Sequence, residues 1–165
     1  MMKRQEQQVT LKKIFYSFLV CLLFIGCSRS IDQEKFNNVN RATKAVQGAI
    51  MTGVNYMKFS ELLQNMGTEI LIIKDKLRTE KEKELLKQYV DVYEMYKDSL
   101  DVWNKKIQAS NEFELAHYTK DRDLLPYAKK YNVEIFRPSH DDVIQTIWRK
   151  ASERIQKIGS LAKAG

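Results

Sequence analysis

Proline and glycine are scarce in this chain of 165 residues, which has two prolines and six glycines. Few positions are therefore available for turns or kinks. Alanine, leucine, glutamate, lysine and isoleucine make up much of the remainder, and these residues favour helix. After the first 27 residues are set aside, the length allows one domain with one modest core. We expect that domain to be almost entirely helical.

Cysteine and histidine, the usual ligands of zinc, are equally scarce. Of the two cysteines, Cys21 lies in an apolar run before the expected helical domain, so no internal disulfide of that domain is expected. The two histidines are too few for a structural zinc site, which takes four ligands. His117 would bind metal only if its loop brought Glu114 and Asp121 together, and we expect His140 to be exposed. We predict no metal and no cofactor.

The positive charge is not gathered into a patch. Lys3, Arg4, Lys12 and Lys13, less Glu6, carry +3 of the formal charge of +7 and lie in the first 13 residues. The other charges alternate in sign along the chain. A nucleic-acid interface needs lysine and arginine on one face, so we predict no nucleic-acid partner.

Catalytic motifs are also lacking. The chain has no glycine-rich phosphate loop, no serine nucleophile elbow and no zincin helix motif. Glu112 and Glu114 are separated by one residue, and no apolar pocket is evident that would raise the pKa of either carboxyl. We therefore expect a protein that is not an enzyme.

The first 27 residues have the order of a secretion signal. Residues 1–13 are polar and basic, and residues 14–26 form an uncharged apolar run. That run is too short to span a membrane, which takes about 20 residues. It has the length of the apolar region of a secretory signal peptide, and it ends at Gly26 and Cys27.

This ending resembles the lipobox of bacterial lipoproteins. Gly26 matches the small residue of that motif, Cys27 matches the lipidated cysteine, and Phe24 stands where leucine is usual. The resemblance covers residues 1–27 and implies cleavage between Gly26 and Cys27, with a diacylglycerol on Cys27. Two or three acyl chains give stable anchoring. The alternative is an uncleaved signal anchor.

The residue after the cysteine bears on the destination. In lipoproteins of bacteria with two membranes, an aspartate there commonly retains the protein in the inner membrane, and this chain has Ser28. The resemblance therefore implies an outer-membrane lipoprotein that faces the periplasm. We expect a signal peptide over residues 1–26, a lipidated tether over 27–33 and a helical domain over 34–158. No family resemblance was found for the domain.

The first part of the domain shows two helical seams. Residues 53–55 are a plausible break between them, and one helix over residues 33–78 is the alternative. The first seam comprises Phe36, Val39, Thr43, Val46, Ile50 and Met57, and the second comprises Phe59, Leu62, Leu63, Met66, Ile70, Ile73 and Leu77.

The next helix begins with a capping box, in which the side chains of Thr79 and Glu82 each accept from the other residue's backbone amide. The short link before it predicts that it packs antiparallel to the preceding helix. Its apolar stripe comprises Leu85, Tyr89, Val92, Tyr96, Leu100, Trp103 and Ile107.

Residues 110–138 form an irregular excursion, and long connections of this kind are often functional. Within it we predict a short helix over residues 124–131, with Asp123 as its cap and Pro126 in its first turn. Asn132 is expected to end that helix in a left-handed conformation.

The last helix is predicted to begin at Ser139, with Asp142 three residues on, and to stop at Gly159. Residues 159–165 would be a flexible tail. The apolar stripe of this helix comprises Val143, Ile144, Ile147, Trp148, Ala151, Ile155 and Ile158.

These features predict an all-α bundle of three to four main helices with a small helical insertion before the last. The leading hypothesis is a non-enzymatic interaction or structural module that contacts another envelope protein. The surface for that partner would include Tyr89, Tyr93, Tyr96, His117 and Tyr131. The alternative is a bundle that binds a small apolar or metal-containing ligand. The stripes suit a monomer and a coiled-coil homo-oligomer equally well.

Overall fold

The computed structural model describes residues 31–111, 116–134 and 138–164, which belong to one compact unit. Within these ranges, the side chains of residues 110–122 and 161–164 are not described. All elements of the described part are helical, so the predicted all-α class is confirmed. The elements are η1 (Gln33–Phe36), α2 (Asn37–Thr52), α3 (Tyr56–Lys74), α4 (Glu80–Asn111), α5 (Ala116–Lys130) and α6 (His140–Ala164).

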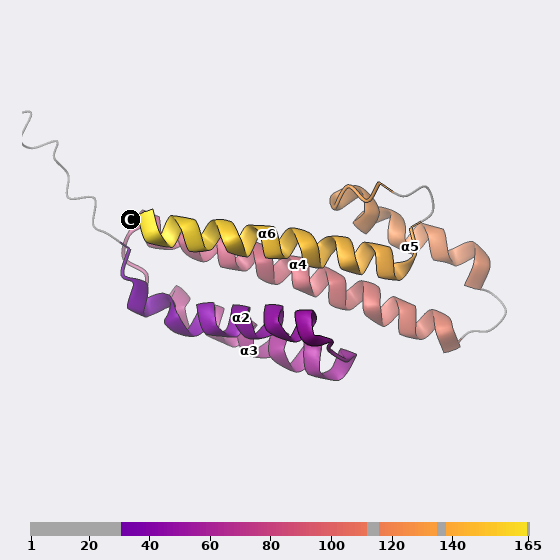
Figure 1. The fold of residues 1–165 in the computed structure, drawn as a ribbon, viewed down its shortest axis with the longest axis horizontal. Coiled ribbons are helices and arrows are strands. Elements are labelled where there is room, and N and C mark those ends of the chain that lie inside the picture. The colour runs from indigo at the N-terminus through magenta and orange to yellow at the C-terminus, as the bar shows by residue number, and fades with distance from the viewer. Residues whose placement is uncertain (1–30, 112–115, 135–137, 165) are drawn as a thin grey trace, which may run out of the picture. The chain divides into compact units, whose positions relative to one another are not determined.

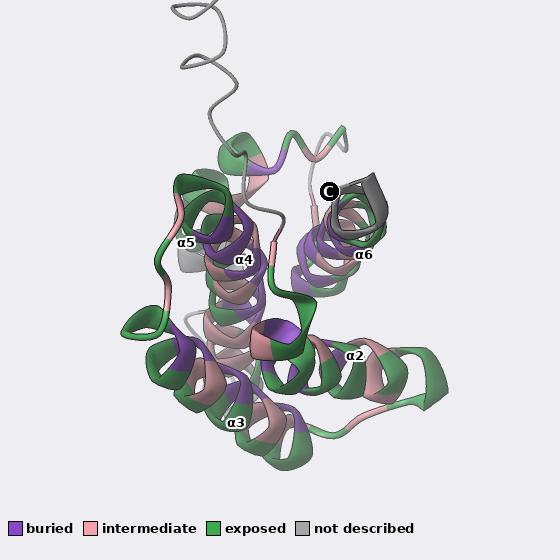
Figure 2. Ribbon diagram, turned by 90° about the vertical axis from the view of Figure 1, so that its left-hand side faces the viewer, coloured by how far each residue is buried: buried purple, intermediate pink, exposed green. Residues whose placement is uncertain are grey.

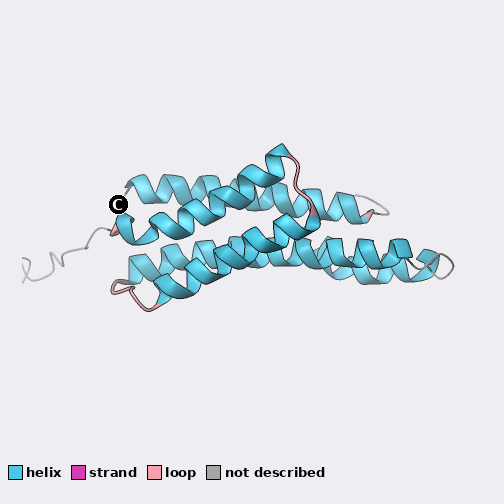
Figure 3. Ribbon diagram, turned by 90° about the horizontal axis from the view of Figure 1, so that it is seen from below, coloured by secondary structure: helices cyan, strands magenta, loops and turns pink. Residues whose placement is uncertain are grey.

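The two long helices α4 and α6 lie antiparallel and side by side (Figures 1 and 3). Arg154 pairs with Asp91 at 2.5 Å, and Lys106 pairs with Asp141 at 2.6 Å. The α2–α3 hairpin packs along the first half of α4, and α5 packs near its other end. The predicted bundle with a small helical element before the last helix is therefore confirmed.

A glycine separates the first two long helices. Gly53 has φ +90°, a conformation that side chains disfavour, so α2 ends there. Asn55 caps α3, and its side chain accepts from the amide of Lys58 at 2.9 Å. The predicted break is confirmed, and the alternative of one continuous helix is wrong. Met57 is 75% exposed, because after the break α3 presents a different face to the core.

The core consists of two clusters along α4. The first joins η1, α2, α3 and the start of α4 to the end of α6, and the second joins the later part of α4 to α5 and the start of α6. Figure 2 shows the buried residues on the facing sides of these helices. Met95, Trp103 and Trp148 pack against both clusters.

Three aromatic rings connect the two clusters. The ring centroid of Phe59 lies 5.9 Å from that of Trp103 and 5.5 Å from that of Trp148, and the centroids of the two indoles are 5.7 Å apart. The indole N–H of Trp148 donates to Ser99 Oγ at 3.0 Å. Large aromatic side chains bury much apolar area, and rings at these separations attract one another. This junction therefore packs α3, α4 and α6 together.

The stripe predicted for α4 is wrong at its far end. Ile107 is 37% exposed, whereas Val102 and Ser99 are fully buried. Past Trp103 the neighbours of α4 are α5 and α6 rather than α3, so another side of the helix is covered. A single stripe describes a helix with one covered face, and α4 has two.

The last helix begins as predicted but ends later. The amide of Ser139 donates to Asp142 Oδ2 at 2.8 Å, and the amide of Asp142 donates to Ser139 Oγ at 3.2 Å. The Ser139 hydroxyl also donates to Asp142 Oδ2, at 2.7 Å, and this hydrogen bond together with the one from the Ser139 amide lowers the pKa of Asp142. The helix then runs through Gly159 to Ala164. Gly159 costs about 1 kcal/mol relative to alanine on an exposed helix, which does not terminate it. The predicted stop at Gly159 is therefore wrong, and residues 160–164 of the predicted tail (159–165) are helical.

The insertion helix is longer than expected. Helix α5 begins at Ala116, so Asp123 is not its cap and Pro126 lies inside the helix rather than in its first turn. Asn132 has φ +48° just after the helix, as predicted.

Glu82 is the most deeply buried charged residue described, with a side-chain exposure of 2%. The predicted capping box is present: the Glu82 amide donates to Thr79 Oγ1 at 3.1 Å, and the Thr79 amide donates to Glu82 Oε2 at 3.1 Å. The amide of Arg78 also donates to Oε2, at 2.8 Å, and Lys35 Nζ of η1 donates to Oε1 at 2.6 Å. This carboxylate thus fixes the start of α4 to the start of the domain.

Its surroundings keep Glu82 ionised. Burial acts to raise the pKa of this carboxyl, but the hydrogen bonds from Lys35, Arg78 and Thr79 and the charge of Lys35 outweigh burial. Together they lower the pKa from 4.5 to about 2. Because the folded pKa is the lower one, Glu82 stabilises the fold fully above pH 4.5, and that contribution is lost as the pH falls through about 2.

We predict that Glu82→Gln lowers the free energy of unfolding by about 2 kcal/mol at pH 7, because a charged hydrogen bond is lost and Lys35 is left half-buried without its carboxylate. The variant should also lose less stability than the native chain between pH 4.5 and 2. Urea unfolding across that range measures both effects. The exposed neighbour Glu84, as Glu84→Gln, is the control and should change stability by less than about 0.5 kcal/mol. Equal losses in the two variants would contradict this role.

Candidate functional site

An apolar groove of about 870 Å³ lies between α3 and α4. We call it the α3–α4 groove. It falls within the size range of ligand and peptide sites, roughly 300 to 1,000 Å³. Its lining residues are Gln64, Gly67, Thr68, Ile70, Leu71, Lys74, Leu77, Lys83, Leu86, Lys87, Val90, Tyr93 and Glu94.

The floor of the groove is buried and its rim is not. Ile70 and Leu86 are 7% and 6% exposed and belong to the core below. Leu71 on the rim is 67% exposed, and Ile72 beside it is 46% exposed. Contiguous apolar surface rimmed by polar residues marks interaction sites more often than single exposed leucines do. The groove is thus the best candidate binding surface among the described residues.

Tyr93 and Gly67 shape one end of the groove. A Cβ atom added to Gly67 would lie 2.8 Å from the hydroxyl oxygen of Tyr93, which is closer than such atoms approach. The absence of a side chain at Gly67 therefore allows Tyr93 of α4 to lie against the backbone of α3. Lys97 Nζ lies 5.5 Å from the centroid of the Tyr93 ring. Of the residues predicted to form a partner surface, Tyr93 is the one that lines the groove.

Charge is unequally distributed along the groove. Lys74 ends α3, and Lys83 and Lys87 begin α4, so three lysines share one end of this antiparallel pair. Lys83 pairs with the exposed Glu80 at 2.6 Å. Within the described part of the chain, Lys74 and Lys87 have no ion-pair partner. The other end carries Glu94, which pairs with Lys97 at 3.1 Å.

The other tyrosines of α4 are not on a surface. Tyr89 and Tyr96 are 3% and 1% exposed, so the prediction that they contact a partner is wrong. Burial raises the pKa of Tyr89 to about 12 and raises that of Tyr96 further. Helical spacing placed both near Tyr93, but α2, α3 and α6 cover their side of α4.

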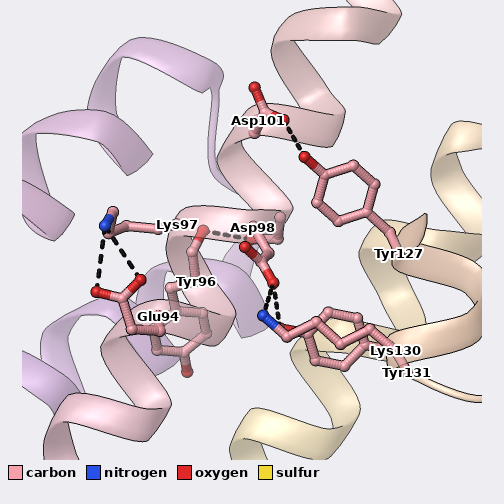
Figure 4. A network of polar contacts seen from close by, with 9 residues as sticks. Glu94, Tyr96, Lys97, Asp98, Asp101, Tyr127, Lys130 and Tyr131 are labelled. Atoms are coloured by element: carbon pink, nitrogen blue, oxygen red, sulfur yellow. Dashed lines mark hydrogen bonds and ion pairs between the residues drawn. The ribbon is translucent and has the colours of Figure 1, made fainter. Parts of the chain in front are cut away.

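Tyr131 is buried as well, in a polar network that connects α5 to α4 (Figure 4). The Tyr131 hydroxyl and Lys130 Nζ both donate to Asp98 Oδ2 at 2.6 Å. One turn later, the Tyr127 hydroxyl donates to Asp101. The prediction of Tyr131 as part of an exposed partner surface is therefore wrong, because its ring packs in the second core cluster.

Electrostatics in this network agree with the geometry. Burial and the hydrogen bond to Asp98 raise the pKa of Tyr131, and burial and Asp101 do the same for Tyr127. Burial acts to raise the pKa of Asp101, but hydrogen bonds from Lys105 and Tyr127 lower it overall. The two carboxylates thus accept and the two phenols donate, and the lowered pKa keeps Asp101 charged at neutral pH.

The remaining predicted site residues do not form a site in the described part. His140 is 5% exposed, which contradicts the expected exposure, because Lys106 and Asp141 hold the first turn of α6 against α4. His117 lies in α5, but its side chain is outside the described residues, as are Gly26 and Cys27. No group of three His, Cys, Asp or Glu residues suited to a metal ion occurs among the described residues.

Comparisons with known proteins give no family. No family model, curated protein or solved structure matches the chain. None of the helices in the described ranges combines the length and the apolar character that crossing a membrane requires.

One sequence signal could have indicated the groove. Residues 70–73 read Ile-Leu-Ile-Ile, and four consecutive apolar residues cannot all share one face of a helix. Ile70 and Ile73 are buried, whereas Leu71 and Ile72 face outward. Helix α3 therefore has more apolar residues than its core-facing stripe needs, and this surplus indicates a second contact surface.

We predict that Asp98→Asn loosens α5 without unfolding the domain, because two donors lose a charged acceptor. Amide hydrogen exchange over residues 124–130 should become about tenfold faster, while exchange in α2 and α3 stays unchanged. Glu94→Gln, one turn earlier on the same helix, is the matched control, since Glu94 pairs with Lys97 and not with α5. Equal acceleration in α5 and α3 would contradict a local role for Asp98.

Proposed function

We propose that this chain is a lipid-anchored protein of the bacterial envelope, and that it acts as a non-enzymatic interaction module by binding another envelope protein in the α3–α4 groove. The observation that carries the proposal is the groove itself. It combines a buried apolar floor with the exposed Leu71 on its rim. Removal of such an apolar surface from water by a partner lowers the free energy of the complex.

The proposed anchor is Cys27. The support is the order of basic flank, apolar run and terminal Gly26–Cys27 in the sequence. Cleavage before Cys27 would leave residues 27–32 ahead of the helical domain, one residue fewer than the predicted tether, because η1 already begins at Gln33. With Ser28 after the cysteine, the proposed location is the outer membrane, facing the periplasm.

The polar groups inside the domain support a role without catalysis. Glu82 caps α4, and Ser99 joins Trp148 to α4. Asp98 accepts from Tyr131, just after α5, and Asp101 accepts from Tyr127 of α5. Among the described residues, no buried side-chain nitrogen or oxygen lacks a hydrogen-bond partner. Each of these groups therefore has a structural task, and none is directed into the groove.

A second candidate function uses the same groove for a small apolar ligand. Its volume of about 870 Å³ lies within the range of such sites. Native mass spectrometry of the purified protein distinguishes the two functions. A bound small molecule would add a small, defined mass to the protein, whereas a groove that binds a protein partner would carry no such added mass.

We predict that Cys27→Ala abolishes incorporation of labelled palmitate and leaves residues 1–26 attached, seen as a larger precursor on a gel, because Cys27 provides the acceptor thiol and cleavage follows lipidation. Cys21→Ala, within the apolar run, is the matched control and should keep both the label and the cleavage. A native chain that takes up no palmitate and keeps residues 1–26 would identify a signal anchor instead.

We predict that Leu71→Asp reduces the yield of a chemically crosslinked complex in intact cells about tenfold or more, because it places a charge on the apolar rim. Met57→Asp is the matched control: Met57 is similarly exposed but lies outside the groove. Both variants should keep the free energy of unfolding within about 0.5 kcal/mol of the native value. Full complex formation by Leu71→Asp would argue against the groove as the binding surface.

A further inference from the structure

We infer that the α3–α4 groove binds an amphipathic helix of about three turns that carries acidic residues at the end nearest Lys74, Lys83 and Lys87. This inference rests on the proposed function, and it adds the shape and the charge of the partner segment. Four features of the groove lead to it: its width, its length, its helical walls and its charge.

The width of the groove indicates an occupant broader than an extended chain. A single acyl chain or an extended peptide could cover the floor around Ile70 and Leu86. It would leave Leu71 in water, because Leu71 lines the groove at its rim and is 67% exposed. A helix is about 10 Å across, so it contacts the floor with one side chain and the rim with its neighbours.

The length of the groove matches three helical turns. Its lining runs from Gln64 to Lys74 on α3 and from Lys83 to Glu94 on α4. At a rise of 1.5 Å per residue, each of these stretches spans about 15 Å. A partner helix of about 11 residues would fill that span and present three anchors, at positions i, i+3 or i+4, and i+7.

The two walls are themselves helices. Because α3 and α4 are antiparallel neighbours, the depression between them is the kind of surface on which a third helix packs ridges into grooves. The opposite side of this pair is already covered by α2 and α6, so the groove faces outward.

Charge gives the occupant its polarity. Lys74, Lys83 and Lys87 occupy one end, and Lys74 and Lys87 have no ion-pair partner in the described part of the chain. The other end carries Glu94, whose charge is already paired with Lys97. An acidic residue on the partner is therefore favoured at the lysine end, and charge complementarity fixes the direction in which the helix docks.

The test places a photo-reactive residue at Leu71, at Lys87 or, as a control, at Met57 in the intact chain in the producing cells. Irradiation at Leu71 and at Lys87 should capture the same protein, and Met57 should not. The two crosslinked sites should map within three turns of each other in one segment. That segment should show the i, i+3 or i+4, i+7 apolar pattern, with at least two Asp or Glu residues near the site captured from Lys87.

A charge variant tests the lysine end separately. Lys74→Gln combined with Lys87→Gln should reduce the adduct at Leu71 about fivefold to tenfold, because two attractive charges are removed. Lys44→Gln combined with Lys76→Gln is the control, since it removes the same net charge from exposed positions outside the groove. This control should leave the adduct yield unchanged.

The outcomes separate the two levels of the proposal. A captured protein segment without the apolar spacing or without acidic residues, or a yield unaffected by the lysine variant, overturns the acidic-helix inference and leaves the proposed function standing. A second copy of this chain in the adduct overturns the inference and the heterologous partner together. Adducts with lipid alone, or no adduct at Leu71 and Lys87, overturn both the inference and the groove as a protein-binding surface.

Discussion

The buried carboxylate of Glu82 is the interaction on which the arrangement of the helices depends. It receives hydrogen bonds from Lys35, Arg78 and Thr79, so one side chain links η1, the α3–α4 connection and the first turn of α4. This position sets where α4 begins, and α4 contributes to both core clusters and to one wall of the groove. A charge this deeply buried is tolerated because each oxygen has donors at short distance, whereas an unpaired one would destabilise the fold.

Local signals in the sequence predicted the fold well. The capping box at Thr79, the N-cap at Ser139 and the break at Gly53 depend on neighbouring residues, and all three are present. Signals that only shift a local preference were misleading. Gly159 weakens a helix without ending it, and Pro126 is accommodated inside α5, because packing against α4 and α6 outweighs a cost of about 1 to 3 kcal/mol.

The candidate site was much less predictable. Periodicity indicates which residues share a face, but it does not indicate what covers that face, so Tyr89 and Tyr96 could not be distinguished from Tyr93. The burial of Tyr131 depends on Asp98, which is 33 residues away in the sequence. The groove requires α3 and α4 to lie side by side, and neither helix forms it alone. Only the apolar excess at residues 70–73 pointed to it.

The junction of Phe59, Trp103 and Trp148 determines what fluorescence reports about this protein. Both tryptophans of the chain lie at this junction, between the two core clusters, and their ring centroids are 5.7 Å apart. Their emission therefore reports the environment at a single position in the domain, where α3, α4 and α6 meet. Fraying of the end of α6 would leave that spectrum unchanged, while separation of the α2–α3 hairpin from α4 would expose both indoles together. Tryptophan emission thus follows hairpin docking, and local changes elsewhere need a probe of their own.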